Sequence, residues 1–405
     1  PVRVPSVSRP CSVRVPSVSR PCPVRVESVT VFLQGDFSLI STAYHLRELE
    51  KPVGVPLSTL GYREFTSHPD WKRNLISFTS LQYHAKRNSV FCGLTAFDND
   101  LMYEFSLADK TFRSLNFADY AEKFEIKIHR SLHLCKDGSL IGATACLHRE
   151  DQMKEGRGGR IFRYDPDQDH YDFLGIPFEH NYIQTITVDE ERQLVYGFTY
   201  PIFAFFVFSL QQRKLLRLDY MGSIPHIVSL DRAGRFWATW NCRTHNLFCY
   251  DPEQDDIRFF YHALPQTVQS CNLMYPGAGP IDSMILGNDG MLYIGEAAGN
   301  LDRLDPTTGQ VVDLGQPVPG ETRIPALALG NNGTIYGIAG FLEKCHMFAY
   351  NPVEEKFTIL GHIHDEKSGI PLFIGHDITL INEHRAFVGE TDTANRAGYL
   401  WECQF

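Results

Sequence analysis

Several side chains that could do chemistry stand where a short apolar run of the sequence begins or ends. They are His129, Gln184, His226, Asp282 and His376 at the starts of runs, and His148, Tyr200 and Glu296 at the ends. Imidazoles titrate near neutrality and serve as acids, bases or metal ligands. Whether these residues form one site depends on the fold that positions them.

Two kinds of chemistry suit this set. In the first, His129, His226 and His376 supply imidazole nitrogens, and Gln184 an amide oxygen, to a divalent metal, for which Zn²⁺, Mn²⁺ and Ca²⁺ are the candidates. In the second, a neutral Tyr or His removes the proton next to a carboxylate, while His, Arg or a metal neutralises the charge that develops. Arg130 stands beside the first histidine and could take part in that neutralisation.

The stretch Ile281–Gly315 shows the element that must carry these residues. It holds four short apolar runs separated by the turns Asn288–Gly290, Gly299–Asn300 and Asp305–Gly309, whose residue types favour tight turns. This pattern predicts a four-stranded antiparallel meander. Alone it would leave two edges unpaired, and it therefore needs neighbouring copies.

Further copies are recognisable along the chain. The second run of each unit packs apolar residues around a small one, as at Phe91–Gly93, Leu140–Gly142, Tyr196–Gly197, Phe236–Ala238, Tyr293–Gly295, Tyr336–Gly337 and Phe387–Gly389. These signatures recur about every 40 to 57 residues, which is the period of propeller blades. The sequence predicts an all-β fold, a single seven-bladed β-propeller over residues 26–405.

The two ends of the chain differ from the repeat. The last blade, from His376 onward, has only three runs, and we expect Thr30–Leu33 to supply the fourth strand outside the C-terminal one. Such closure removes the open edge of the ring. Residues 1–25 repeat an eleven-residue unit rich in Pro, Ser and Arg, and we expect them to be a disordered tail.

Propeller topology predicts where the chemistry gathers. The first strand of each blade starts at one face of the disc, and the loop after the second strand returns to that face. The run starts and run ends named above should therefore share one mouth. The turns between first and second strands, such as Lys136–Gly138, should lie on the opposite face.

Composition limits the partners. The formal charge of −10 argues against a nucleic-acid footprint, although a local basic patch can still bind an anionic substrate. No apolar run approaches the length of a membrane span, and the N-terminus lacks the apolar core of a signal peptide. We therefore expect a soluble monomer that binds neither nucleic acid nor membrane.

The ten cysteines follow no regular spacing. Cys92, Cys135 and Cys146 lie in apolar runs, and we expect buried thiols rather than a disulfide framework. Cys242 and His245, in the stretch Cys-Arg-Thr-His, have a spacing that could begin a zinc site. The alternative is a hairpin that carries a cysteine and a histidine with no metal.

With these residues the chain resembles the seven-bladed propeller polysaccharide lyases, meaning the ulvan lyases and, more distantly, the oligogalacturonate lyases. The resemblance lies in His129–His133 (His-Arg-Ser-Leu-His), in His148, and in Tyr196–Pro201 (Tyr-Gly-Phe-Thr-Tyr-Pro). It implies that Tyr200 acts as base and acid, and that His and Arg neutralise a uronate carboxyl. The oligogalacturonate lyases are similar in using a metal held by His and Gln.

The ulvan lyases also place an Arg shortly after the Tyr. Here Arg213 and Arg217 follow Tyr200, but we expect both near the turn on the opposite face. Arg243 is the substitute for the neutralising role.

The sequence thus predicts a polysaccharide lyase that cleaves a uronate-containing glycan by β-elimination. Its predicted residues are catalytic His129, His148, Tyr200 and His226, and substrate-binding Arg130, Gln184, Arg243, Glu296 and His376. Two alternatives stay open. One is a non-catalytic propeller that binds protein or glycan, and the other is a metal-dependent hydrolase or lactonase-type propeller with Asp282 and Glu296 as ligands.

Overall fold

The computed structural model describes residues 39–47, 75–97, 99–146, 148, 150–222, 225–240, 246–265, 280–393 and 397–405. Within them the chain is built almost entirely of strands. The helical segments of this part are short 3₁₀ turns, η2 (Ala85–Arg87), η3 (Phe117–Asp119) and η4 (Glu150–Glu155). In these ranges we find no helix with the length and apolarity that a membrane crossing requires.

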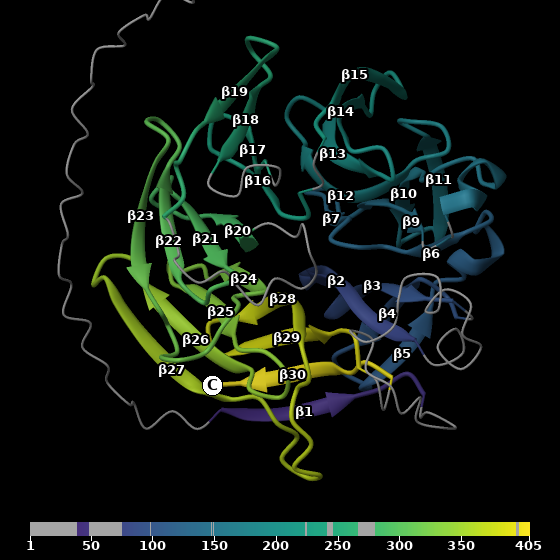
Figure 1. Cartoon of the computed structure of the whole chain (residues 1–405). Helices are drawn as coiled ribbons and strands as arrows, with labels where there is room; N and C mark the ends of the chain where they lie inside the picture. Colours follow the sequence, from purple (N-terminus) through teal and green to yellow (C-terminus); the bar gives the residue numbers. More distant parts are fainter. Residues whose placement is uncertain are drawn as a thin grey trace, which may run out of the picture. The chain divides into compact units, whose positions relative to one another are not determined.

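The strands form seven antiparallel sheets, the blades of a β-propeller (Figure 1). Blade 1 holds β2 (Ile76–His84), β3 (Ser89–Ala96), β4 (Met102–Ser106) and β5 (Thr111–Ser114). Blade 2 holds β7 (Leu132–Leu134), β8 (Leu140–Ala143), β10 (Ile161–Asp165) and β11 (His170–Gly175). Blade 3 holds β12 (Tyr182–Asp189), β13 (Leu194–Tyr200), β14 (Ala204–Ser209) and β15 (Lys214–Tyr220).

The remaining blades follow the same order from the first to the fourth strand. Blade 4 holds β16 (Val228–Leu230), β17 (Phe236–Thr239), β18 (Leu247–Asp251) and β19 (Asp256–Phe260). Blade 5 holds β20 (Ile281–Leu286), β21 (Leu292–Glu296), β22 (Leu301–Asp305) and β23 (Gln310–Gly315). Blade 6 holds β24 (Ala326–Leu329), β25 (Ile335–Ala339), β26 (His346–Asn351) and β27 (Lys356–His362).

Blade 7 joins the two ends of the described chain. It contains β28 (Gly375–Asn382), β29 (Arg385–Glu390) and β30 (Leu400–Gln404), and β1 (Ile40–Tyr44) pairs antiparallel with β30 as the fourth strand (Figure 1). The predicted mode of closure is therefore confirmed, but the predicted strand is wrong. Thr30–Leu33 lies outside the described residues, and the place beside β30 is taken by β1.

The seven first strands form a ring. Each contacts the first strand of the next blade, and β28 of the last blade contacts β2 of the first. Because these strands begin at the same face, the residues just before or at their starts lie around one axial mouth. The seven-bladed propeller predicted from the repeat is confirmed.

The small residue in the second strand has a clear packing reason in three of the blades. Gly142, Gly197 and Gly337 lie directly opposite an aromatic residue of the third strand, and at Gly197 that partner is Phe206. A Cβ added at Gly197 would come within 2.7 Å of the Phe206 ring. In these three blades the ring covers the glycine, whereas in blades 1, 5 and 7 the glycine lies opposite Met102, Leu301 and Leu400.

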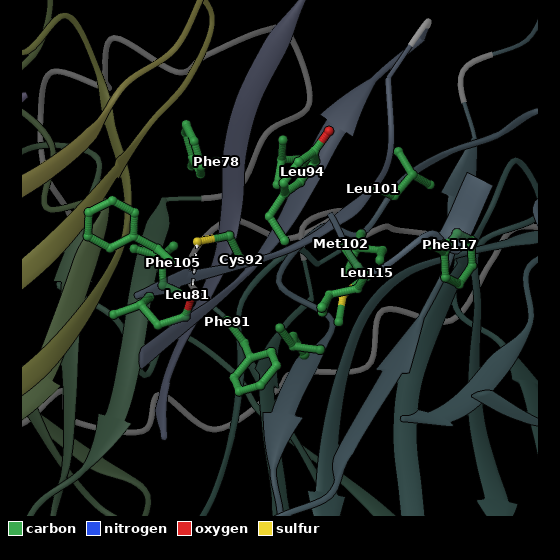
Figure 2. Packing of buried hydrophobic residues seen from close by; sticks show 14 of the residues in the cluster. Phe78, Leu81, Phe91, Cys92, Leu94, Leu101, Met102, Phe105, Leu115 and Phe117 are labelled. Atoms are coloured by element: carbon green, nitrogen blue, oxygen red, sulfur yellow. Dashed lines mark hydrogen bonds between the residues drawn. The ribbon is translucent and has the colours of Figure 1, made fainter. Parts of the chain in front are cut away.

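The core consists of buried side chains within and between the blades. Figure 2 shows one such cluster, which includes Phe78 and Leu81 of β2, Phe91 of β3 and Phe105 of β4. Six cysteines of the described ranges, Cys92, Cys135, Cys146, Cys249, Cys345 and Cys403, are buried free thiols. The prediction of buried thiols at the first three is confirmed.

Two short strands outside the blade pattern lie at the mouth. β6 (Glu125–Lys127) pairs with the end of β3 and with β9 (Ala145–Cys146), so that these two strands extend the sheet of blade 1. The chain runs from β6 directly into His129 and blade 2. This extension carries a lysine toward the histidines described next.

Candidate functional site

Four predicted donor residues meet at the axis. His129 precedes β7, Gln184 lies in β12, His226 precedes β16, and His376 lies in β28. The Nε2 atoms of His129 and His376 are 3.0 Å apart. The Gln184 side-chain nitrogen is 3.5 Å from His129 Nδ1 and 3.4 Å from His226 Nε2. Four blades thus contribute to one cluster, which we call the axial cluster: His129, Gln184, His226 and His376.

Hydrogen bonding sets the tautomer of the central ring. His129 Nδ1 lies 3.0 Å from the backbone oxygen of Gln184. A carbonyl oxygen only accepts, so Nδ1 carries the proton and the Nε2 lone pair points at His376. On the other side of that contact, His376 Nδ1 is buried and has no hydrogen-bond partner among the described residues.

The imidazoles of the axial cluster are held neutral. Burial, together with the positive charges of Lys127 and Arg130, lowers the pKa of His226 to about 3. Burial also lowers the pKa of His129 and of His376 well below the usual value, with Lys127 the next cause at His129 and Arg130 at His376. Neutral rings offer lone pairs, which suits ligands better than acids at neutral pH.

Three cationic side chains surround the axial cluster. Arg130 donates to the backbone oxygen of Pro325 at 3.0 Å. Arg323 donates twice to Asp282, at 2.7 and 2.9 Å, and its Nη1 is buried without a hydrogen-bond partner in the described part of the chain. Burial lowers the pKa of Lys127 to about 8. Sequence reasoning missed Lys127, although its place two residues before His129 in an extended segment was a usable signal.

A cavity of about 120 Å³ extends along the axis next to the cluster and is lined in part by Arg130, His226 and Asp377. Asp377 lies on β28 and accepts the backbone N–H of Leu81 at 2.7 Å. Burial raises its pKa to about 6, against the opposing effect of Arg130. The cavity therefore has polar groups of both signs on its wall.

His148 and Tyr200, the other predicted catalytic residues, contact a second group of aromatic residues. The His148 ring lies 5.1 Å from Tyr182 and 5.3 Å from Phe124, measured between ring centroids. Tyr200 is the cross-strand partner of Tyr182, and its ring lies 6.0 Å from Phe203. These contacts place His148 and Tyr200 next to Tyr182, at the start of blade 3.

Glu296 has a different environment from the one expected. Its side chain is buried beside Asp302 of β22, and burial raises the pKa of both carboxyls, with each carboxyl also affected by the other. The Asp282 carboxylate forms an ion pair with Arg323. The two carboxylates of the hydrolase-type alternative are thus engaged with different partners, and this arrangement does not favour a shared metal site between them.

The other predicted residues lie elsewhere or outside the described ranges. Arg213 pairs with Asp172, and Arg217 pairs with Asp219 on the outer strand β15. Arg243, predicted to bind substrate, and Cys242 and His245, predicted to bind zinc, lie outside the described residues.

Two features of the axial cluster bear on whether it could hold a metal ion. Cis ligands of an octahedral ion with bonds of about 2.1 Å are about 3.0 Å apart, and the two facing Nε2 atoms are 3.0 Å apart. An Nδ1–H bonded to a backbone carbonyl is the usual support of a ligating Nε2, and His129 has it. Gln184 would direct its side-chain oxygen at the metal if its amide were rotated by 180°. The oxygen and nitrogen of such an amide are told apart only by their hydrogen-bond neighbours.

Comparison with known proteins shows the fold alone. No protein-family model matches the sequence, and no curated protein is similar to it. The structure is similar to the extracellular domains of two hybrid two-component systems of B. thetaiotaomicron, with TM-scores of 0.55 and 0.53 and 15% sequence identity in both cases. Each match covers 81% of this chain but only 38% and 39% of the other chain. The chain is thus a seven-bladed propeller.

Proposed function

We propose that this propeller is a metal-dependent polysaccharide lyase that cleaves a uronate-containing glycan by β-elimination at the axial mouth. The observation that carries the proposal is the convergence of His129, Gln184, His226 and His376 from four blades, with the Nε2 atoms of His129 and His376 3.0 Å apart. Nitrogen and amide-oxygen donors of this kind suit a divalent transition metal.

The residues of the mouth have separate roles in this proposal. A bound metal would supply a Lewis acid for the uronate carboxylate. Arg130 and Arg323 add fixed positive charge beside it, and these charges stabilise the anion that forms when the α-proton leaves. Tyr200, as its phenolate, takes that proton. The electron pair then forms the carbon–carbon double bond while the carbon–oxygen bond to the glycosidic oxygen breaks, and Tyr200 returns the proton to that oxygen, leaving an unsaturated uronate and a regenerated phenolate.

A functional assay can test the proposal directly. The protein is incubated with pectate, ulvan and glycosaminoglycan fragments, after chelation and after addition of Mn²⁺, Zn²⁺ or Ca²⁺, and unsaturated product is followed by its ultraviolet absorbance. We expect product from at least one polymer, and loss of that product after chelation.

Two variants separate the roles. His376→Ala should lose both metal and activity, whereas Tyr200→Phe should keep the metal and lose about 10²–10⁴-fold in rate, the usual contribution of a general base. His384→Ala, at an exposed turn, is the matched control and should behave as wild type. If no polymer yields product with any of the metals, the lyase proposal is wrong. Glycan binding without turnover would then support the non-catalytic alternative.

A further inference from the structure

Three side chains with metal-ligand chemistry meet on the face of the disc opposite the mouth. His133 lies on β7, Cys135 directly follows that strand, and Glu190 directly follows β12 of the next blade. One ligand atom of each, an imidazole nitrogen, the thiol sulfur and a carboxylate oxygen, lies within 4.8 Å of the other two. We call these residues the lower cluster.

Local backbone structure directs all three side chains to one point. His133 and Cys135 are two residues apart in an extended segment, so they project to the same side. The turn after Cys135 is closed by its own backbone, since Cys135 N–H donates to Ser139 O at 2.8 Å and Gly138 N–H donates to Cys135 O at 2.9 Å.

The carboxylate is oriented as well. Lys136 N–H donates to one oxygen of Glu190 at 2.9 Å. The other oxygen faces His133 Nε2 at 3.2 Å. The hydrogen bond from Lys136 fixes the Glu190 carboxylate and leaves its other oxygen directed at the His133 ring. Carboxylate ligands of metals are commonly oriented by a hydrogen bond of this kind.

We propose that His133, Cys135 and Glu190 bind a zinc ion that joins blades 2 and 3. Thiolate, imidazole and carboxylate are the ligands zinc prefers, whereas magnesium and calcium select oxygen atoms alone. A tetrahedral zinc with bonds of about 2.1–2.3 Å holds its ligand atoms about 3.4–3.7 Å apart. The lower cluster reaches that spacing by small side-chain movements.

Exposure at the lower cluster decides the fourth ligand. The thiol residue Cys135 is 8% exposed, whereas the side chains of His133 and Glu190 are 34% and 22% exposed. Solvent reaches the site from the histidine and carboxylate side, so the fourth position takes a water molecule. When zinc binds, the Cys135 thiol releases its proton to solvent and the thiolate bonds to the metal. Binding therefore adds one negatively charged sulfur ligand and frees one proton.

Cobalt titration distinguishes this site from the axial cluster, because only the lower cluster contains sulfur. Full-length protein is titrated with Co²⁺, and the thiolate-to-cobalt absorption band in the near ultraviolet is recorded. We expect one such band in wild type that zinc displaces, and its loss in Cys135→Ser. Glu190→Gln should weaken cobalt binding at least about tenfold, or 1.4 kcal/mol.

Two controls complete the experiment. His226→Ala removes an axial donor and should leave the band unchanged, and Cys249→Ser tests a buried thiol of blade 4 and should also leave it unchanged. Circular dichroism establishes that each variant is folded. The proposal is overturned if wild type shows no band, or if Cys135→Ser keeps it. The contact between His133 and Glu190 is then an ordinary ion pair beside a core thiol.

Discussion

The carboxylate of Glu125 is the support on which the mouth extension β6–β9 depends, and its removal gives a sharp test of the structure. The Glu125 side chain is fully buried, and it accepts Thr144 Oγ1 at 2.6 Å, Arg160 Nε at 2.9 Å and Glu122 N–H at 2.8 Å. Arg160 Nη2 also pairs with it. In Glu125→Ala these donors lose the carboxylate, and the buried guanidinium keeps only the Tyr120 backbone oxygen at 2.7 Å and a 3.9 Å contact with Glu122.

Breaking a buried ion pair from one side costs about 3–5 kcal/mol, because the remaining buried charge loses its main compensation. We therefore expect the free energy of unfolding to fall by that amount in Glu125→Ala, measured by urea denaturation with tryptophan fluorescence. Glu125→Gln, which keeps one carbonyl acceptor, should lose less. Arg157 forms an ion pair with Glu122 while its side chain is 75% exposed, and Arg157→Ala should lose no more than about 1 kcal/mol.

A loss below about 1 kcal/mol in Glu125→Ala would show that water reaches the Arg160 guanidinium, and the reasoning would fail. The same variant has a functional consequence, since β6 leads directly into His129 of the axial cluster and helps to fix its position. If β6 is released, metal binding at the axial cluster should weaken while the lower cluster, on the other face, keeps its cobalt band.

Two further predictions concern pH and have opposite signs. Hydrogen bonds from Arg87 and Arg113 lower the pKa of Glu104 to about 2, against the effect of burial. The free energy of unfolding should therefore fall by about 1–2 kcal/mol as pH falls from about 4.5 toward 2, a figure reduced for solvent screening at the half-exposed Arg113. Glu104→Gln should remove this acid-dependent part of the unfolding free energy. Burial raises the pKa of Glu296 and Asp302, so their contribution to stability is present at low pH and lost as pH rises. Denaturation from pH 5 to 8.5 should show a decline in the free energy of unfolding that disappears in the double variant E296Q/D302N. If the decline has the same slope in the double variant, the buried pair is contradicted.

Most of the architecture could be predicted because its signals are local. A turn such as Asn288–Gly290 and a second-strand glycine such as Gly197 report on their own hairpins, and repetition multiplies the signal. The closing strand was misplaced for the opposite reason. Outer strands such as β1 face one neighbour only, so Ile40–Tyr44 has a weaker pattern than Thr30–Leu33, and nothing local specifies which segment pairs with β30.

The candidate site was predictable only in part. His129, Gln184, His226 and His376 were assigned from their place at the starts of first strands, a property of the repeat. Lys127 was missed because β6, which extends the sheet of blade 1, is not one of the four repeated strands of a blade. The neighbours of Glu296 depend on the third strand of its own blade, where Asp302 gives no apolar signal to indicate that its carboxyl is buried.

The axial cluster shows why no local motif announces such a site. Its donors are separated by 55 residues between His129 and Gln184, by 42 between Gln184 and His226, and by 247 between His129 and His376. Each spacing is set by how many residues the intervening blades use, and loop insertions change it without moving the side chain. What stays constant is the topological position, because every first strand starts at the mouth. A search for sites of this kind should therefore compare residues by their place within the blade rather than by their separation along the chain.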